Sequence, residues 1–370
     1  MNFDYNEEQQ LLADSVRRFL AKDYEFEKRR KMVAGEGWNP QVWAQLAEMG
    51  VTGIPFSTDY GGFGGGAVDL MGVMEAFGDA LLVEPYVPTI LAAQLVARAG
   101  NEAQKKAILP RVVEGKLRLA FAHTEKGARY NNGRVQTKAT RSGSGWELSG
   151  EKLVALGAPL AETLVVSART DNGVSLFLVD QKTAGVTLKP YRTVDETKAA
   201  DVTLNGVKVG ADALLGAEGG AVPVIEETTD FATALVCSEA VGAMKFACDT
   251  TLEYLKTRKQ FGVPIGTFQA LQHRIVDMYI SYEQARSMAC LAASRIDSSS
   301  DARERARAVS AAKIKIADAC RHVSQEAIQL HGGMGMSEEL KVSHTFRRLT
   351  MIAQQFGDAD HHLARFAALG

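Results

Sequence analysis

The spacing of apolar residues divides the chain into three regions. Over residues 1–116 apolar positions recur every three or four residues, which is typical of amphipathic helices. Over 117–218 short alternating segments replace them, punctuated by turn sequences such as Asp171-Asn172-Gly173, and these predict a small β-domain, sandwich- or barrel-like. Over 219–370 the helical period returns in long stretches. The order helical, β, helical predicts an α+β protein that ends in a four-helix bundle.

The same pattern predicts individual elements. Ser298-Ser299-Ser300-Asp301 is expected to cap the third helix of the bundle. Helices are expected at about 7–31, 40–50, 68–81, 88–100, 102–115, 223–257, 268–297, 301–331 and 337–366, and strands at Leu117–Ala122, Trp146–Leu148, Thr163–Ala168, Ser175–Val179, Val186–Lys189 and Val202–Leu204.

Composition narrows the functional classes. The 370 residues carry a net charge of −2, so there is no global basic surface for nucleic acid. No run of 18 apolar residues occurs, which predicts no membrane span, and the acidic start Met1–Glu8 is typical of neither a signal peptide nor a transit peptide. The four cysteines fall in predicted helices without a Cys-x-x-Cys, so we expect reduced thiols and a cytoplasmic location.

The connection between the first two C-terminal helices contains candidate binding chemistry. Gly262, Pro264 and Gly266 break the backbone, Arg258 ends the first helix and Gln269 opens the second. A permanent cation beside the free N–H groups of a helix start is suited to a pyrophosphate. The alternative is an ordinary helix–loop–helix corner with a surface arginine.

Two motifs together resemble a known family. Arg258-Lys259-Gln260-Phe261-Gly262, followed by Phe268-Gln269, resembles the flavin-binding segment of acyl-CoA dehydrogenases, and Gln329–Gly335 resembles a second motif of that family. The resemblance covers essentially the whole chain and is nearest to the branch called pimeloyl-CoA dehydrogenase small subunit. It implies FAD as the cofactor and the family's arrangement of an N-terminal helical domain, a middle β-domain and a C-terminal four-helix bundle.

The resemblance also assigns cofactor contacts to residues. Arg258 pairs with the pyrophosphate of FAD, and the residues around it line the adenosine. Both motifs serve the flavin of a neighbouring subunit, which implies an oligomer. The implied contacts are Arg258, Gln260, Phe261, Ile265, Phe268, Gln269, Gln329, Leu330, Gly332 and Gly333, with Thr124 on the flavin-ring side.

The chain departs from the family where the flavin ring is held. Thr124 and Glu125 match the family's Thr-Glu-Pro segment, but Lys126 replaces the proline and the following Gly-Ser-Asp is absent. Val154 and Leu156 stand where the family has a tryptophan and a hydroxyl residue, and leucine offers no hydrogen bond. We therefore expect the β-domain of this chain to bind a flavin ring poorly.

The catalytic base is absent from both of its usual places. The family's glutamate falls on Phe356, and the alternative position on the preceding helix falls on Ala232. Asp358 is the nearest candidate base, whereas Glu239 is expected to pair structurally within the bundle. Asp358–His362 has the composition of a metal cluster, but neighbouring helical residues point in different directions, so no metal site is predicted.

Three functions remain open at this stage. The favoured one is a subunit of an acyl-CoA dehydrogenase that oxidises an acyl-CoA to its 2,3-enoyl-CoA, sharing its active site with a larger homologue in an α2β2 heterotetramer. The second is a self-sufficient homo-oligomer with Asp358 as base, and the third is a non-catalytic structural subunit. The resemblance implies electron-transfer flavoprotein as the electron acceptor and suggests a dicarboxylyl or bulky acyl group.

Overall fold

The computed structural model describes residues 5–370, so the first four residues of the opening Met1–Glu8 stretch lie outside it. Contacts between residues divide the chain into two compact units. We call them the bundle unit and the sheet unit. The bundle unit comprises the chain up to Lys31, Gly66–Leu82 and Thr233–Gly370, and the sheet unit comprises Met32–Gly65 and Val83–Ala232.

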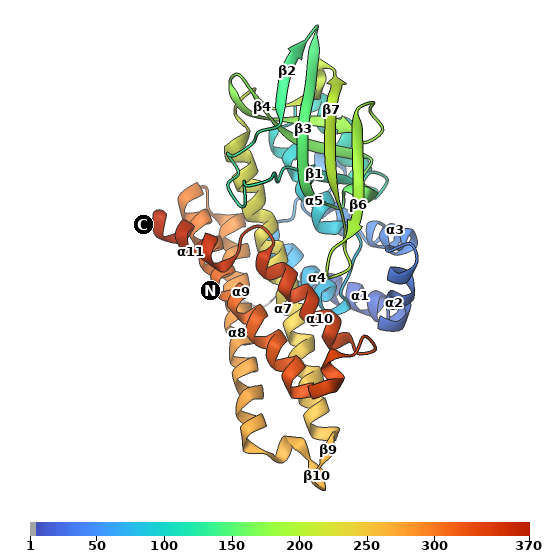
Figure 1. Cartoon of the computed structure of the whole chain (residues 1–370), viewed down its shortest axis with the longest axis vertical. Coiled ribbons are helices and arrows are strands. Elements are labelled where there is room, and N and C mark those ends of the chain that lie inside the picture. The colour runs from blue at the N-terminus through green and yellow to red at the C-terminus, as the bar shows by residue number, and fades with distance from the viewer. Residues whose placement is uncertain (1–4) are drawn as a thin grey trace. The chain divides into compact units, whose positions relative to one another are not determined.

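The sheet unit is built on one mixed eight-stranded sheet (Figure 1). Its strand order is β6-β7-β3-β2-β4-β5-β8, and β1 lies parallel to β4. Trp146 and Phe177 form the centre of its core, edge to face with ring centroids 5.3 Å apart. The strands are β1 (Leu119–Ala122), β2 (Lys138–Ser142), β3 (Gly145–Leu156), β4 (Thr163–Thr170), β5 (Gly173–Asp180), β6 (Val186–Arg192), β7 (Lys198–Val209) and β8 (Leu214–Leu215).

Five of the six predicted strands are longer than the alternation predicts, β1 is shorter, and the sheet has two further strands. β3 and β7 each contain 12 residues, because register shifts after Leu148 and Lys152 interrupt the alternation without ending the pairing. β2 was not predicted, since only Ala139 of its five residues is buried. β8 was also not predicted and is two residues long.

Three helices complete the sheet unit. The Asn39 side chain caps the first of them, and Asn101 and Gln104 form a capping box on the last. Trp43 points inward, as predicted, and its indole N–H donates to Gly115 O at 2.8 Å. The helices are α3 (Pro40–Glu48), α5 (Tyr86–Ala99) and α6 (Glu102–Val113).

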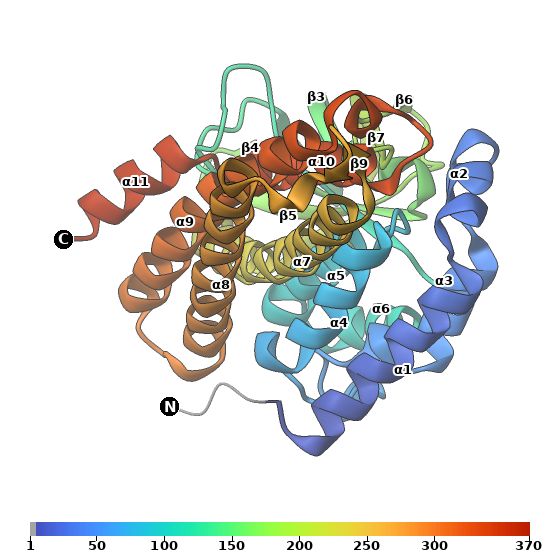
Figure 2. The ribbon, with the colours of Figure 1, turned by 90° about the horizontal axis from the view of Figure 1, so that it is seen from below.

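In the bundle unit, the long helix α9 packs against α8, α10 and α11 (Figure 2). Helices α4 and α7 cross at backbone distance, since a Cβ on Gly78 or on Gly242 would overlap the main chain of the other helix. The short hairpin β9–β10 joins α7 to α8. The helix α7 (Ala221–Thr257) begins in the sheet unit and belongs to the bundle unit from Thr233 on. The other elements are α1 (Glu7–Asp23), α4 (Ala67–Ala80), β9 (Lys259–Gln260), β10 (Val263–Pro264), α8 (Gln269–Ser298), α9 (Ala302–His331), α10 (Lys341–Gln354) and α11 (Ala359–Ala368).

Two predictions of a single continuous helix were wrong, because the structure has two helices in each place. The helix expected at 7–31 is α1 followed by a separate α2 (Phe26–Ala34). The helix expected at 337–366 is α10 and α11, which are separated by a turn with positive φ at Phe356 and Gly357. The predicted cap of α9 is confirmed, because Asp301 accepts the Arg303 N–H at 2.8 Å.

The cysteines and the apolar helix α7 agree with a packed interior. All four cysteines are free thiols, and Cys237, Cys248 and Cys320 are buried. Among residues 5–370, α7 alone is long and apolar enough to cross a membrane by length and composition, although no such span was predicted. Because 89% of its apolar window is buried within the fold, α7 has the burial of a core helix.

Candidate functional site

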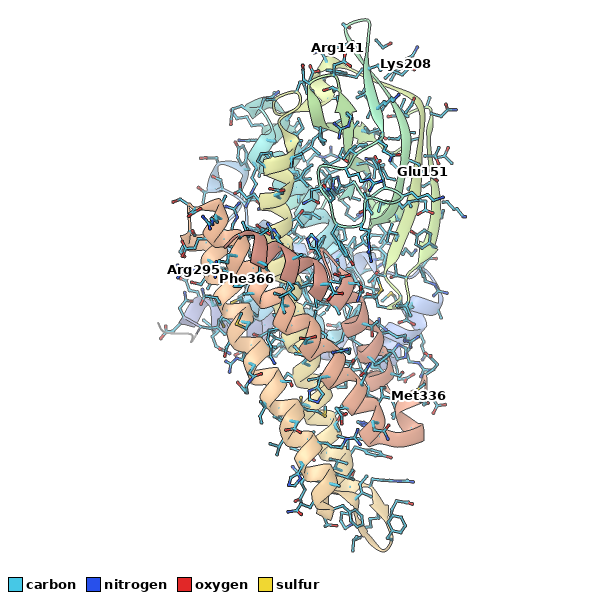
Figure 3. All side chains as sticks on the ribbon, turned by 60° about the vertical axis from the view of Figure 1, so that its left-hand side comes forward. Arg141, Glu151, Lys208, Arg295, Met336 and Phe366 are labelled. Atoms are coloured by element: carbon cyan, nitrogen blue, oxygen red, sulfur yellow. The ribbon has the colours of Figure 1, made fainter. Side chains whose placement is uncertain are left out.

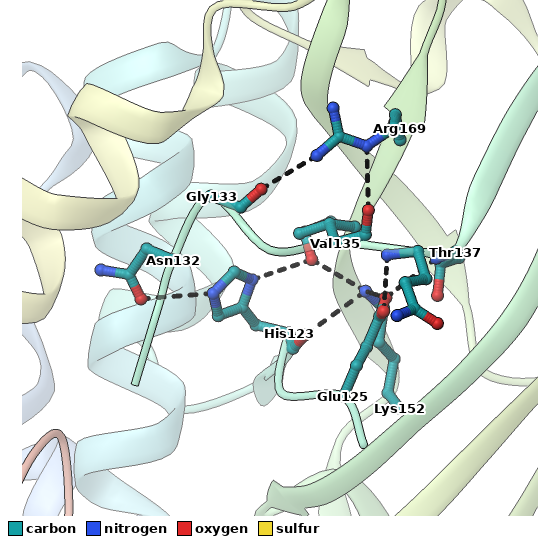
Figure 4. Close-up of polar contacts among 10 residues, drawn as sticks. His123, Glu125, Asn132, Gly133, Val135, Thr137, Lys152 and Arg169 are labelled. Atoms are coloured by element: carbon teal, nitrogen blue, oxygen red, sulfur yellow. Dashed lines mark hydrogen bonds and ion pairs between the residues drawn. The ribbon is translucent and has the colours of Figure 1, made fainter. Parts of the chain in front are cut away.

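A buried polar network anchors the segment that follows β1 (Figure 4). Lys152 on β3 is fully buried, and its Nζ donates to Glu125 Oε1 at 2.7 Å and to Ser167 Oγ at 2.9 Å. Burial lowers the pKa of the Lys152 ammonium, and the Glu125 carboxylate opposes that effect. Burial raises the pKa of Glu125, but the hydrogen bond and charge of Lys152 outweigh it and hold the net pKa below its usual value. The pair is therefore an ion pair at neutral pH.

His123 extends this network in one defined protonation state. Its Nδ1 lies 2.9 Å from Ser167 Oγ and its Nε2 lies 3.3 Å from Asn132 Oδ1. Because the Lys152 ammonium donates to Ser167 Oγ, the serine hydroxyl is left to donate to Nδ1, and Nε2 carries the imidazole proton. Burial, followed by the charge of Lys152, lowers the pKa of His123 to about 4, so the ring is neutral at physiological pH.

The network fixes the long loop between β1 and β2. Glu125 accepts the backbone N–H groups of Gln136 and Thr137 at 2.6 and 3.0 Å. Arg169 donates to the carbonyls of Gly133 and Val135, both at 2.9 Å. This network was not predicted. Its sequence signal is a lysine, Lys152, that directly precedes the apolar run Leu153–Leu156 of a predicted β-domain.

The flavin-ring positions of the sheet unit offer little polar chemistry. Thr124 is exposed, and its carbonyl accepts the Leu153 N–H at 2.7 Å. Val154 has φ 52°, which is strained for a β-branched residue, and its N–H donates to Asp201 Oδ1 at 3.1 Å. Its side chain is 46% exposed and apolar, and Leu156 is half-buried. Of the side chains predicted to face the ring, only Thr124 carries a hydrogen-bonding group.

The adenosine-side residues gather on the hairpin between α7 and α8. Arg258 is exposed, and its guanidinium makes no hydrogen bond or ion pair with any residue from 5 to 370. Phe261 is 90% exposed with φ 55° and meets Phe268 edge to face, with ring centroids 6.1 Å apart. Gln269 begins α8, whose N-cap residue supplies no side-chain cap. An unpaired cation thus lies near a helix start whose N–H groups have no side-chain acceptor.

The structure brings the second motif to the same end of the bundle unit. The ring of Tyr254, on the last turn of α7, stacks on His331, the last residue of α9, with centroids 4.5 Å apart. Gln329 is exposed, whereas Leu330 is buried and packs in the core. This stacked pair, which was not predicted, joins the two motifs.

Two glycines leave the end of α9 open. Gly332 has φ 58°, which favours glycine, and a Cβ added to Gly333 would meet nothing within 4 Å. No packing within the described chain therefore requires Gly333, but a ligand approaching the backbone closely would. Met336 beyond it is 73% exposed and projects from the ribbon (Figure 3). Arg258, the start of α8 and the open Gly333 fit the anionic ADP half of FAD.

The carboxylates near the C-terminus have structural partners. Glu239 forms a buried bidentate ion pair with Arg348 at 2.6 and 2.7 Å, as predicted. Asp358 caps α11 by accepting the His361 N–H at 2.8 Å. It also lines a groove of about 490 Å³ between α9, α10 and the start of α11. Ala232 is fully buried and Phe356 carries no ionisable group, so neither can act as the base. Asp358, the predicted candidate base, and Asp360 both lie beside this turn and line the groove.

Family models match three successive parts of the chain. The acyl-CoA dehydrogenase N-terminal domain matches residues 6–116, the middle domain 120–207 and the C-terminal domain 220–368. Together they span nearly the whole sequence.

Individual relatives match over similar lengths. Acyl-CoA dehydrogenase FadE12 of Mycobacterium tuberculosis is 32% identical, over 95% of this chain and 93% of its own. The caffeyl-CoA reductase-Etf complex subunit CarC of Acetobacterium woodii is 30% identical, over 93% of each. Among solved structures, a variant of the Tcur3481-Tcur3483 steroid ACAD has a TM-score of 0.89 and 30% identity, covering 98% of this chain and 97% of that one. The ChsE4-ChsE5 complex from Mycobacterium tuberculosis has a TM-score of 0.90 and 27% identity, covering 100% and 98%.

Proposed function

Because the chain belongs to the acyl-CoA dehydrogenase family, we propose that it is one subunit of a two-subunit enzyme whose larger partner supplies the catalytic base. The chain is an FAD-dependent oxidoreductase by family. When bound, FAD accepts the β-hydride of an acyl-CoA while a carboxylate removes the α-proton, and the product is the 2,3-enoyl-CoA. The proposal concerns which subunit supplies which part of the active site.

The contribution of this chain is to hold the ADP half of the cofactor. Arg258 would pair with the pyrophosphate through its unpaired guanidinium, and the first N–H groups of α8 would add their dipole end. Gly333 would admit the cofactor close to the backbone. These groups lie on the exposed end of the bundle unit, where a flavin held by another subunit can reach them.

The observation that carries the proposal is the side chain at position 356. The resemblance places the family's catalytic carboxylate there, and phenylalanine cannot accept a proton. The flavin-ring positions Val154 and Leu156 have lost their hydrogen-bonding groups as well. The chain thus has residues that would hold the ADP half of FAD, but it lacks the family's catalytic base and the polar groups that contact the flavin ring. This combination fits a subunit that completes the active site of another chain.

The names of relatives support such a division. One solved relative is a complex of ChsE4 with ChsE5, and CarC is a subunit of a caffeyl-CoA reductase-Etf complex. By analogy, this chain would assemble with a larger homologue as an α2β2 heterotetramer, pass its electrons to an electron-transfer flavoprotein, and act in the cytoplasm. A dicarboxylyl or bulky acyl-CoA is the proposed substrate class.

A second candidate is a self-sufficient homo-oligomer that uses Asp358. The observation in its favour is that Asp358 lines a groove large enough for part of a ligand. Against it, the same carboxylate already caps α11.

Co-purification tests the proposal. The full-length chain, tagged and isolated from its native cells, should bring down an acyl-CoA dehydrogenase homologue that is longer than 370 residues and has glutamate at the position of Phe356. The complex should contain more FAD per chain than this protein purified alone. A fully flavin-loaded assembly of this chain only would overturn the proposal.

A further inference from the structure

The turn between α10 and α11 has an unfavourable backbone for its sequence. Phe356 has φ 61° and Gly357 has φ 126°. The left-handed region is disfavoured for a residue with a bulky side chain, and such residues persist where the surroundings over-determine them. Glycine at 357 is required for a second reason, because a Cβ there would lie 2.5 Å from Nε2 of His362.

A fully buried lysine holds this turn from α9. Lys313 Nζ donates to Gly357 O at 2.7 Å and to Ala353 O at 3.2 Å. Within residues 5–370 no carboxylate lies within 4.0 Å of this ammonium, so its hydrogen bonds go to main-chain carbonyls. A cation at the C-terminal end of α10 complements the helix dipole. Burial of the charge is unfavourable and lowers the pKa of Lys313, and the hydrogen bonds to the two carbonyls offset part of that cost.

A buried histidine holds the same turn from α11. His362 is 1% exposed, with Nε2 at 3.2 Å from Phe356 O and Nδ1 at 3.3 Å from Ser310 Oγ. A carbonyl oxygen only accepts, so Nε2 carries the proton and Nδ1 accepts from the serine hydroxyl. Burial lowers the pKa of His362 to about 3, which keeps the ring in this neutral form.

We propose that Lys313 and His362 are positioning residues that fix the direction of the side chain at position 356. The turn that they hold has the backbone geometry for orienting a catalytic carboxylate, although Phe356 stands at that position. The second part of this inference, that the turn orients a catalytic carboxylate, rests on the proposed function. Val154 also has a strained φ, of 52°, at a predicted flavin-ring position. In both places a residue other than glycine has a positive φ where the resemblance expects a functional side chain and this chain has an apolar one.

The direction of the side chain can be measured without catalysis. 4-Fluorophenylalanine placed at position 356 of the full chain should give one fluorine resonance, displaced from the solvent-exposed shift. His362→Leu and Lys313→Met should each broaden it or move it toward the exposed shift, whereas His362→Gln, which retains a donor near Nε2, should preserve it. An unchanged resonance in both His362→Leu and Lys313→Met would overturn the positioning role.

Placing a carboxylate at position 356 tests whether the turn orients a catalytic base. With the chain saturated with FAD, Phe356→Glu should reduce its flavin with acyl-CoA at least about tenfold faster than Phe356→Gln, since a positioned base contributes roughly 10²–10⁴-fold. Adding His362→Leu should remove most of that gain in kcat with little change in KM, and His362→Gln should keep it. Equal rates in the Phe356→Glu and Phe356→Gln variants would show that the turn does not orient a catalytic base. If the chain binds no flavin in any assembly, the proposed function fails, and the fluorine experiment still decides the positioning role.

Discussion

Tyr254 and His331 stack with their ring centroids 4.5 Å apart, and this contact joins the two sequence motifs of the bundle unit. Tyr254 lies one turn before Arg258, whose N–H donates to the Tyr254 carbonyl at 2.8 Å. His331 immediately precedes the glycines at the end of α9. Residues far apart in sequence thus lie at one end of the bundle unit, where we propose that they hold the ADP half of FAD.

Arg258→Ala should weaken FAD binding by the assembled protein roughly ten- to a hundredfold. A hydrogen bond to a charged group contributes about 1.5–3 kcal/mol, and the guanidinium has no competing partner in the described chain. Arg258→Lys should recover only part of the affinity, because lysine lacks the planar fork. Fluorescence titration of the apoprotein with FAD measures the effect. Lys259→Ala, which removes the adjacent exposed charge, is the control. Equal affinities for Arg258→Ala and the unmodified protein would make Arg258 an ordinary surface residue.

Lys152→Met should lower the free energy of unfolding by about 3–5 kcal/mol. The variant leaves the Glu125 carboxylate buried without its cation, and such a charge is costly. Urea unfolding monitored by circular dichroism gives the value. Lys208→Met on the exposed face of β7 is the matched control and should change stability by less than about 0.5 kcal/mol (Figure 3). A loss as small as that of the control would show that the pair contributes nothing.

Stability should fall as the pH drops from about 6.5 toward 4, partly through His123. The unfolded imidazole takes up its proton near pH 6.5, whereas burial lowers the folded pKa to about 4, so the unfolded state binds more protons in this window. One such group contributes at most about 1.4 kcal/mol per pH unit. His123→Asn should reduce the slope of unfolding free energy against pH, and the exposed His273→Asn should not. Identical slopes for the two variants would contradict the buried neutral state of His123.

The exposed apolar face of α8 should be part of an assembly interface. Val276 and Ile280 are about half exposed, lie one turn apart, and line an apolar groove with Leu252, Ile275 and Tyr279. We expect native mass spectrometry to show a dimer or tetramer and Ile280→Lys to shift it to smaller species. Asp277→Lys, at an exposed position that is absent from this groove, should leave the mass unchanged. A stable monomer at micromolar concentration would exclude this interface.

The sequence was informative where one local pattern decides the structure. Periodicity located α5, α8 and α9 to within two residues, and glycine and proline located the connection after Arg258. It was uninformative where distant residues decide. Nothing in the sequence near Lys152 shows that Glu125 and Ser167 surround its ammonium. Likewise, nothing near the turn between α10 and α11 shows that Lys313, 44 positions before Gly357, donates to the carbonyl of that glycine.

Contacts with a ligand or another chain were accessible only through the resemblance. Leu330 is buried although the resemblance assigns it to the cofactor, so only its backbone is available for such a contact. All of the assigned site residues, from Arg258 to Thr124 and Asp358, remain predictions, because side-chain position alone does not assign a catalytic or binding role.

The rate of flavin reduction by acyl-CoA, measured for the chain alone and mixed with its larger homologue, tests the division of labour directly. Asp358→Asn is the informative variant, because asparagine retains the N-cap of α11 while removing the carboxylate. We predict that the isolated chain holds FAD substoichiometrically and reduces it slowly, that the mixture gains both, and that Asp358→Asn leaves the rate of the mixture unchanged. Brisk turnover by the isolated chain, abolished by Asp358→Asn, would contradict the account and make Asp358 the base.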